Sequence, residues 1–213
     1  MVRVKFCGIT NDRDAMLAVT LGVDALGFVF APSSRRVSPE VARRIIQGLP
    51  PFVQTVGVFV NENPVRVEEI VRFCGLDMVQ LHGDEPPDLC KTLMPRTIKA
   101  FRLKGEPDLQ SLESYRGKVR AFLFDTYVED RRGGTGKTFD WGLALSGKEM
   151  GVPVILAGGL NPGNVCEAVT VVRPYAVDVG SGIEESPGKK SFFLMKKLLQ
   201  RMREIHSGNA EEE

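Results

Sequence analysis

The chain has 213 residues, of which 43% are hydrophobic and 26% charged, a composition typical of a globular protein with a sizeable core. Lys and Arg number 28 against 27 for Asp and Glu, so the net charge of +1 argues against a nucleic-acid partner or an acidic membrane surface. No apolar run approaches the ~20 residues that cross a bilayer, and the N-terminus MVRVKFCGIT lacks the apolar core of a signal peptide, so we expect a cytoplasmic protein with no membrane partner.

Short apolar segments recur along the chain and predict strands. Several of them are apolar at consecutive positions, which is typical of parallel strands that are buried on both faces. The eight segments are residues 2–6, 25–30, 54–60, 78–81, 96–101, 121–125, 152–156 and 176–180.

Helix-like segments separate these strands, and several carry a start signal. Thr10 is expected to cap a helix over 11–21 that ends at Gly22. Three further starts pair a capping residue with proline at the first helical position, namely Ser38–Pro39, Asn63–Pro64 and Asn161–Pro162. The last helix is expected to present one apolar face, made of Met195, Leu198, Leu199 and Met202.

Strand and helix thus alternate eight times, without a composition shift that would mark a domain boundary. This count predicts a single-domain (β/α)8 TIM barrel with eight parallel strands over residues 1–206, followed by a polar tail at 207–213. An open doubly wound sheet is the alternative architecture.

The stretch GGTGKT at 133–138 resembles a nucleotide-binding loop but fails the test of its context. The motif GxxxxGK[ST] needs glycine at the position of Arg131, and the preceding strand ends near Asp125, eleven residues before Gly136. We therefore predict that residues 126–139 form a long loop that acts as a lid over an active site. Lys137 either faces a substrate or is solvated, and the sequence leaves both open.

Glycine clusters follow the seventh and eighth predicted strands. Gly158 and Gly159 come after the seventh, and the sequence Gly180, Ser181, Gly182 comes after the eighth. Glycine allows the backbone to approach an anion closely, and the loops after strands seven and eight are the usual phosphate site of β/α barrels. Although ordinary turns would explain either cluster alone, the pair predicts a phosphorylated ligand.

Three reactive side chains fall at C-terminal strand ends: Cys7, His82 and Asp125. In a barrel all three would lie at the catalytic rim. Alone, each has a purely structural interpretation, as a core thiol, a backbone hydrogen-bond partner and a turn cap. Beside a phosphate site, Cys7 and Asp125 become catalytic candidates.

The other cysteines are expected to be buried thiols, because the chain has no CxxC pair and no zinc-like cluster, and we expect no metal.

Several motifs resemble the phosphoribosylanthranilate isomerase family in one consistent order from Val4 to about Lys190. They include VKFCGIT at 4–10, GFVFAPSSRRVSPE at 27–40, VQLHGDE at 79–85, GGTGKTFDW at 133–141, LAGGLNPGNV at 156–165 and VDVGSGIEESPGKK at 177–190. The chain departs from the family pattern at Gly180, where serine is expected. A phosphate contact through the main chain would survive that change, whereas a hydroxyl contact would not.

The resemblance implies an Amadori rearrangement in L-tryptophan biosynthesis, which converts N-(5-phosphoribosyl)anthranilate to 1-(2-carboxyphenylamino)-1-deoxyribulose 5-phosphate without a cofactor. The family's general base falls on Cys7 and its general acid on Asp125. Arg36 would meet the anthranilate carboxylate, His82 would form part of the pocket wall, and the glycine loops around Gly158 and Gly182 would hold the phosphate. The partner is then a small phosphosugar, and the chain is expected to be a monomer or homodimer.

The chemistry of the residues suits such a reaction. An acid must protonate the furanose oxygen so that the ring opens, and a base must then remove a proton beside the resulting imine. Because free Cys titrates near ~8.5 and Asp near ~3.9, this hypothesis requires a lowered pKa for Cys7 and a raised pKa for Asp125.

Three other functions compete with this interpretation. One is a different phosphosugar barrel: indole-glycerol-phosphate synthase would need a set of catalytic lysines, and the histidine-pathway isomerase usually has aspartates at both catalytic strand ends, which Cys7 at the first strand argues against. A nucleotide-binding switch or ATPase would use GGTGKT. A catalytically silent barrel would serve only as a binding module.

Overall fold

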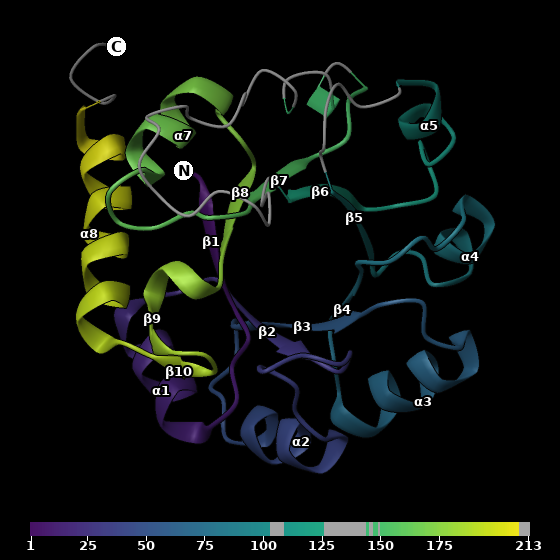
Figure 1. Cartoon of the computed structure of the whole chain (residues 1–213), viewed down its shortest axis with the longest axis horizontal. Coiled ribbons are helices and arrows are strands. Elements are labelled where there is room, and N and C mark those ends of the chain that lie inside the picture. Colours follow the sequence, from purple (N-terminus) through teal and green to yellow (C-terminus); the bar gives the residue numbers. More distant parts are fainter. Residues whose placement is uncertain (103–108, 126–143, 145–146, 149, 209–213) are drawn as a thin grey trace.

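A computed structural model describes residues 1–102, 109–125, 144, 147–148 and 150–208 of the chain. Eight parallel strands form one closed barrel in sequence order, and β1 closes the ring by pairing with β8 (Figure 1). The predicted barrel is confirmed, and the open doubly wound sheet is wrong because the first and last strands pair. The strands are β1 Arg3–Cys7, β2 Ala25–Val29, β3 Gln54–Phe59, β4 Met78–Leu81, β5 Thr97–Arg102, β6 Ala121–Asp125, β7 Val154–Ala157 and β8 Ala176–Val179.

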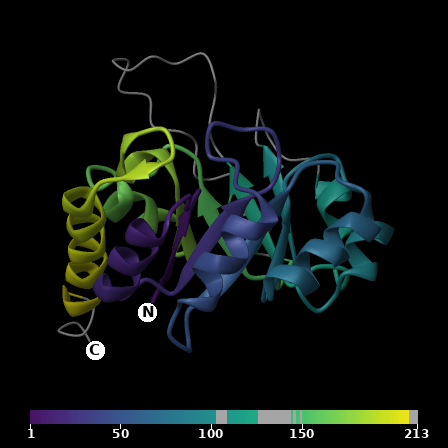
Figure 2. The same cartoon turned by 90° about the horizontal axis from the view of Figure 1, so that it is seen from below.

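Helices surround the barrel on its outside, and α8 runs along the wall beside α1 and α7 (Figure 1). A short hairpin, β9 Glu184–Ser186 with β10 Lys189–Lys190, lies at the opposite end of the barrel from the N-terminus (Figure 2). None of the described helices is long and apolar enough to cross a membrane. They are α1 Asp12–Leu21, α2 Pro39–Gln47, α3 Pro64–Cys74, α4 Pro87–Thr92, α5 Leu109–Glu113, α7 Val165–Val172, α8 Phe192–Gly208 and the 3₁₀ turn η1 Ser181–Ile183.

Two of the four predicted helix starts are confirmed. The hydroxyl of Ser38 and the amide oxygen of Asn63 accept hydrogen bonds at the first turns of α2 and α3, and each is followed by proline. The prediction for α1 is wrong by one residue, because Asn11 caps the helix by accepting from the Asp14 amide, while the Thr10 hydroxyl donates to the Gly188 carbonyl instead.

The predicted start of α7 at Asn161 is also wrong. The side-chain oxygen of Asn161 accepts from the Gly163 amide at 2.8 Å and so closes a local turn. The helix begins only at Val165, after Asn164.

The core has two parts, one inside the barrel and one between the barrel and its helices. The outer part includes the face of α8 that the sequence predicted, since Met195, Leu198, Leu199 and Met202 are all buried. The inner part is built from small and branched side chains of alternate strand positions, as expected for a packed barrel: Val56, Ile98, Ala100, Ala121, Leu123, Ile155, Ala157 and Ala176.

Candidate functional site

The three reactive residues predicted at strand ends lie at the C-terminal end of the barrel. Cys7 is the last residue of β1, Asp125 is the last of β6, and His82 follows β4 directly. All three are partly buried. The ring nitrogen Nε2 of His82 lies 3.1 Å from Oδ2 of Asp125, so the structure brings these two side chains together across the rim.

A layer of polar side chains lies beneath this rim, inside the barrel. The ammonium of Lys5 donates to Oδ2 of Asp178 at 2.8 Å and to Oε1 of Gln80 at 2.9 Å. These contacts join β1 with β8 and β4, and all three residues are buried. Because strand side chains alternate between faces, Cys7 shares the inward face of β1 with Lys5.

Lys5, Gln80 and Asp178 are not among the site residues predicted from the sequence. Their signal was present, because each is a polar residue inside an apolar strand segment, namely VRVKF, MVQL and AVDVG. A charged side chain is almost never fully buried unless it is paired. Such residues in strands that are buried on both faces therefore indicate a partner inside the barrel.

The electrostatic surroundings of Cys7 act against the lowered pKa that the sequence hypothesis required. Burial of the thiol raises the pKa of Cys7, and the carboxylate of Asp178 raises it further. The ammonium groups of Lys5 and Lys190 lower this pKa but do not outweigh the first two effects. In the free protein, the lowered pKa that the hypothesis requires for Cys7 is therefore not found.

We predict that alkylation of Cys7 by iodoacetamide will have a pH midpoint above that of the same thiol in the denatured chain, because only the thiolate reacts and the folded protein raises the pKa of Cys7. Mass spectrometry of the Cys7 peptide over a pH series measures this midpoint, with the denatured chain as the control. A midpoint below that of the denatured chain would contradict the prediction and would show that the two lysines dominate.

A second buried cation, Lys190, connects the end of β1 to the loop after β8. Its Nζ atom lies 2.6 Å from the Cys7 carbonyl, 3.0 Å from the Gly180 carbonyl and 2.8 Å from Oε1 of Glu184. Glu184 in turn accepts two parallel hydrogen bonds from Arg35. This cluster fastens the loop after β2 to the glycine loop after β8.

Arg36 lies in the loop after β2 and is exposed. Its amide donates to the Ser33 carbonyl, which fixes the backbone at that point. Within the described ranges, no carboxylate pairs with its guanidinium. The neighbouring arginines all have partners: Arg35 binds Glu184, Arg43 lies 4.7 Å from the centre of the Phe73 ring, and Arg44 binds Asp12.

The two glycine loops lie against each other at the same end of the barrel. Gly158 and Gly159 adopt φ values of +89° and +64°, which favour glycine. A Cβ atom on Gly182 would overlap the Leu160 carbonyl, so this residue allows the loops after β7 and β8 to pack backbone to backbone. Gly180 precedes η1 at φ −108°, and Ser181 opens that turn and is exposed.

We expect Gly182→Ala to disrupt this packing and to lower the free energy of unfolding by about 1–3 kcal/mol, as overpacking typically does. Gly180→Ser is the matched variant, because a Cβ there would meet the Cys7 carbonyl at 3.8 Å, an ordinary contact. It should unfold like the wild type. Urea denaturation checks both, and equal stability of all three chains would contradict the prediction for Gly182.

The predicted lid at 126–139, with GGTGKT and Lys137, lies outside the described residues.

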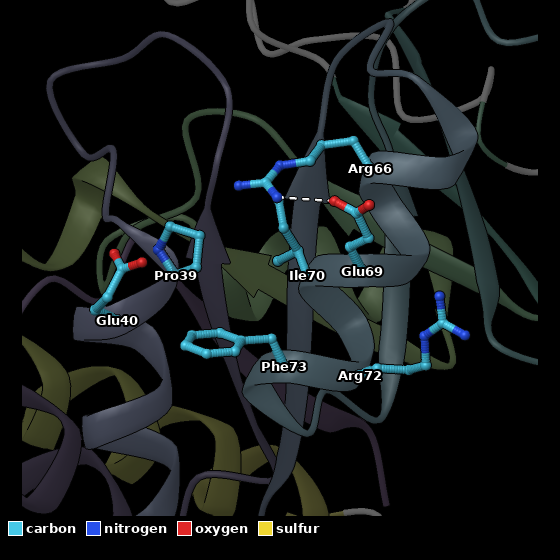
Figure 3. Close-up of a pocket in the computed structure, with 7 residues that line it drawn as sticks. All are labelled: Pro39, Glu40, Arg66, Glu69, Ile70, Arg72 and Phe73. Carbon is cyan, nitrogen blue, oxygen red and sulfur yellow. Dashed lines mark hydrogen bonds and ion pairs between the residues drawn. The ribbon is translucent and has the colours of Figure 1, made fainter.

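A groove of about 550 Å³ lies on the outer surface between α2 and α3, with Arg66, Ile70 and Phe73 among its lining residues (Figure 3). It is separate from the rim that carries Cys7 and Asp125. Among the described residues, no three His, Cys, Asp or Glu side chains come together as ligands for a metal ion.

Comparison with known proteins identifies a family for nearly the whole chain. The family model described as N-(5'phosphoribosyl)anthranilate (PRA) isomerase matches residues 4–201. The enzyme of that name from Geobacter sulfurreducens is 53% identical over 202 residues, which cover 94% of this chain and 98% of that protein. The Moorella thermoacetica enzyme is 52% identical, over 91% of this chain and 88% of the relative.

Solved structures agree with this family. The phosphoribosyl anthranilate isomerase of Thermotoga maritima is 48% identical with a TM-score of 0.88, and the match covers 96% of this chain and 100% of that one. A structure of such an isomerase in complex with reduced 1-(o-carboxyphenylamino)-1-deoxyribulose 5-phosphate is 45% identical with a TM-score of 0.85, at the same coverage. On its sequence and its fold, this chain belongs to the N-(5'-phosphoribosyl)anthranilate isomerase family.

Proposed function

We propose that the chain catalyses the reaction for which its family is named, the isomerisation of N-(5'-phosphoribosyl)anthranilate in tryptophan biosynthesis, with Cys7 as general base and Asp125 as general acid. The observation that carries this assignment is that Cys7, Asp125 and two contacting glycine loops all meet at the C-terminal end of one barrel. In β/α barrels this end holds the active site.

The proposed reaction begins when Asp125 donates its proton to the furanose ring oxygen. The bond between that oxygen and C1' breaks, and the lone pair of the anthranilate nitrogen forms a protonated imine. The thiolate of Cys7 then removes the proton from C2', and the bonding electrons move toward the imine to give an enolamine. The enol proton leaves and C1' gains a proton, which yields the ketose. Cys7 and Asp125 return to their starting states by exchanging protons with water.

Three groups are proposed to hold the substrate. Arg36 binds the anthranilate carboxylate, and its exposed guanidinium, beside three partnered arginines, supports this role. The loops that contain Gly158, Gly159, Gly180, Ser181 and Gly182 bind the phosphate through backbone amides, next to the buried cation of Lys190. His82 contributes to the pocket wall beside Asp125.

The direct test follows the loss of anthranilate fluorescence from freshly made phosphoribosylanthranilate. We expect rapid loss that depends on enzyme concentration and saturates with substrate. An inactive, folded chain would overturn the proposed function, and other aminoaldose phosphates would then be assayed. Titration with ATP and magnesium in a calorimeter addresses the competing nucleotide-binding function, for which we expect no binding.

The remaining proposals concern the chain as a whole. We propose a cytoplasmic protein whose catalytic domain covers residues 1–206, with a polar tail at 207–213. It is a monomer or a homodimer that binds a small phosphosugar and no nucleic acid. One solved relative is described as monomers of the dimeric isomerase of Thermotoga maritima. Sedimentation velocity distinguishes the two assembly states.

A further inference from the structure

A chain of hydrogen bonds crosses the barrel from Lys5 to Asp125, and its direction can be deduced. The ammonium of Lys5 can only donate, so Oε1 of Gln80, at 2.9 Å, accepts. The amide nitrogen of Gln80 therefore faces the other way, and it lies 2.8 Å from Nδ1 of His82. Since an amide nitrogen donates, Nδ1 must accept and carries no proton. The proton of the neutral ring is then on Nε2, 3.1 Å from Oδ2 of Asp125.

Burial of the Gln80 amide makes this direction of the hydrogen-bond chain costly to reverse. Gln80 is only 1% exposed, so a flipped amide would leave its nitrogen against the Lys5 ammonium with no water to separate the two donors. The ion pair with Asp178 holds the Lys5 ammonium in place. Gly27 leaves room for this arrangement, since a Cβ there would approach Cε of Lys5 to 3.1 Å and Sγ of Cys7 to 2.9 Å.

We propose that Gln80, oriented by Lys5, is a positioning residue that fixes His82 in its Nε2–H tautomer, so that the neutral imidazole donates to Asp125. The donated hydrogen bond sets the orientation of the Asp125 carboxyl group. A neutral donor does so without adding a full positive charge, which would favour the ionised carboxylate over the protonated form that a general acid needs. The catalytic importance of this His82 tautomer rests on the proposed function, whereas the inference of the tautomer itself does not.

The tautomer can be observed directly, because the chain has only two histidines, His82 and His206. Long-range proton–nitrogen correlation spectra of ¹⁵N-labelled protein distinguish the two neutral tautomers and the imidazolium, and His206→Gln assigns the signals. We expect the Nε2–H pattern for His82 at neutral pH in the wild type. An Nδ1–H or imidazolium pattern would overturn the proposal without any further variant.

Gln80→Glu tests the role of the amide with almost no change of shape. A carboxylate accepts from both neighbours, so His82 should change to the Nδ1–H form or to the imidazolium. Gln80→Met removes the donor without adding charge and should give a mixture of His82 tautomers. This variant provides the test if Gln80→Glu folds poorly. Gln54→Glu is the matched control, since Gln54 is exposed at the start of β3. An unchanged tautomer in folded Gln80 variants would overturn the proposal.

Kinetics test the consequence for the reaction. We expect kcat of Gln80→Glu to fall by about 10- to 100-fold, by analogy with the loss caused by removing the outer hydrogen-bond partner of a metal-bound histidine. KM should change little, because Gln80 is buried beneath the rim. A changed tautomer with unchanged kcat would overturn the positioning role. An inactive wild type that shows the Nε2–H tautomer would overturn the proposed function and leave the tautomer inference intact.

Discussion

Cys7→Ser and Asp125→Asn are each expected to lower kcat by about 10²–10⁴-fold, the usual contribution of a general base or a general acid. The hydroxyl of serine is far less acidic than a thiol. Serine also fits the space of Cys7, whereas a larger side chain would not fit because Gly27 packs against the sulfur. Asparagine has no proton to deliver to a ring oxygen, but its carbonyl can still accept from Nε2 of His82. The expected effect therefore comes from lost proton transfer.

Steady-state kinetics of the fluorescence loss measure these effects, and circular dichroism verifies that each variant is folded. Cys166→Ser is the matched control, because Cys166 is a second partly buried thiol that lies on α7, away from the strand ends, and its change should leave kcat unaltered. An unimpaired Cys7→Ser would retain the isomerase function but would require a different base. An Asp125→Asn variant with unchanged kcat would likewise show that Asp125 is not the general acid.

Lys99→Met is expected to lower the free energy of unfolding by about 3–5 kcal/mol, the typical cost of removing one partner of a buried ion pair. The Nζ atom of Lys99 lies 2.9 Å from Oε2 of Glu85, and both side chains are only 2% exposed. It also donates to the Gly83 carbonyl at 2.6 Å. Its loss would leave a buried carboxylate without its cation, in the loop that directly follows His82.

Urea denaturation measures this cost. Arg66→Ala is the control, because it breaks an ion pair with Glu69 in which both side chains are about half exposed, and we expect about 0–1 kcal/mol. The double variant Lys99→Met/Glu85→Leu should recover part of the lost stability, since no buried charge remains unpaired. A cost for Lys99→Met as small as that of Arg66→Ala would show that the pair does not support this loop.

The alternation of strands and helices could be predicted from the sequence because burial on both faces leaves an apolar run in every strand. The apolar runs also indicated where each strand ends. The location of Cys7, His82 and Asp125 at one end of the barrel could therefore be predicted from the sequence. Helix starts were less predictable. Ser38 and Asn63 cap as expected, but Thr10 is engaged by the carbonyl of Gly188, which is distant in sequence. Local preference cannot anticipate a partner of this kind.

What the sequence by itself determined is the barrel, its catalytic end and the family, because these depend on periodicity and on motifs that are contiguous in the chain. The tertiary structure alone decided that, among the described residues, Arg35, Arg43 and Arg44 have side-chain partners while the guanidinium of Arg36 pairs with no carboxylate, and it decided which polar side chains meet inside the barrel. Lys5 reaches Gln80 and Asp178, which lie 75 and 173 residues away. The raised pKa of Cys7 follows from burial and from Asp178. Burial and electrostatic effects depend on distances in space, which only the closing of the barrel sets.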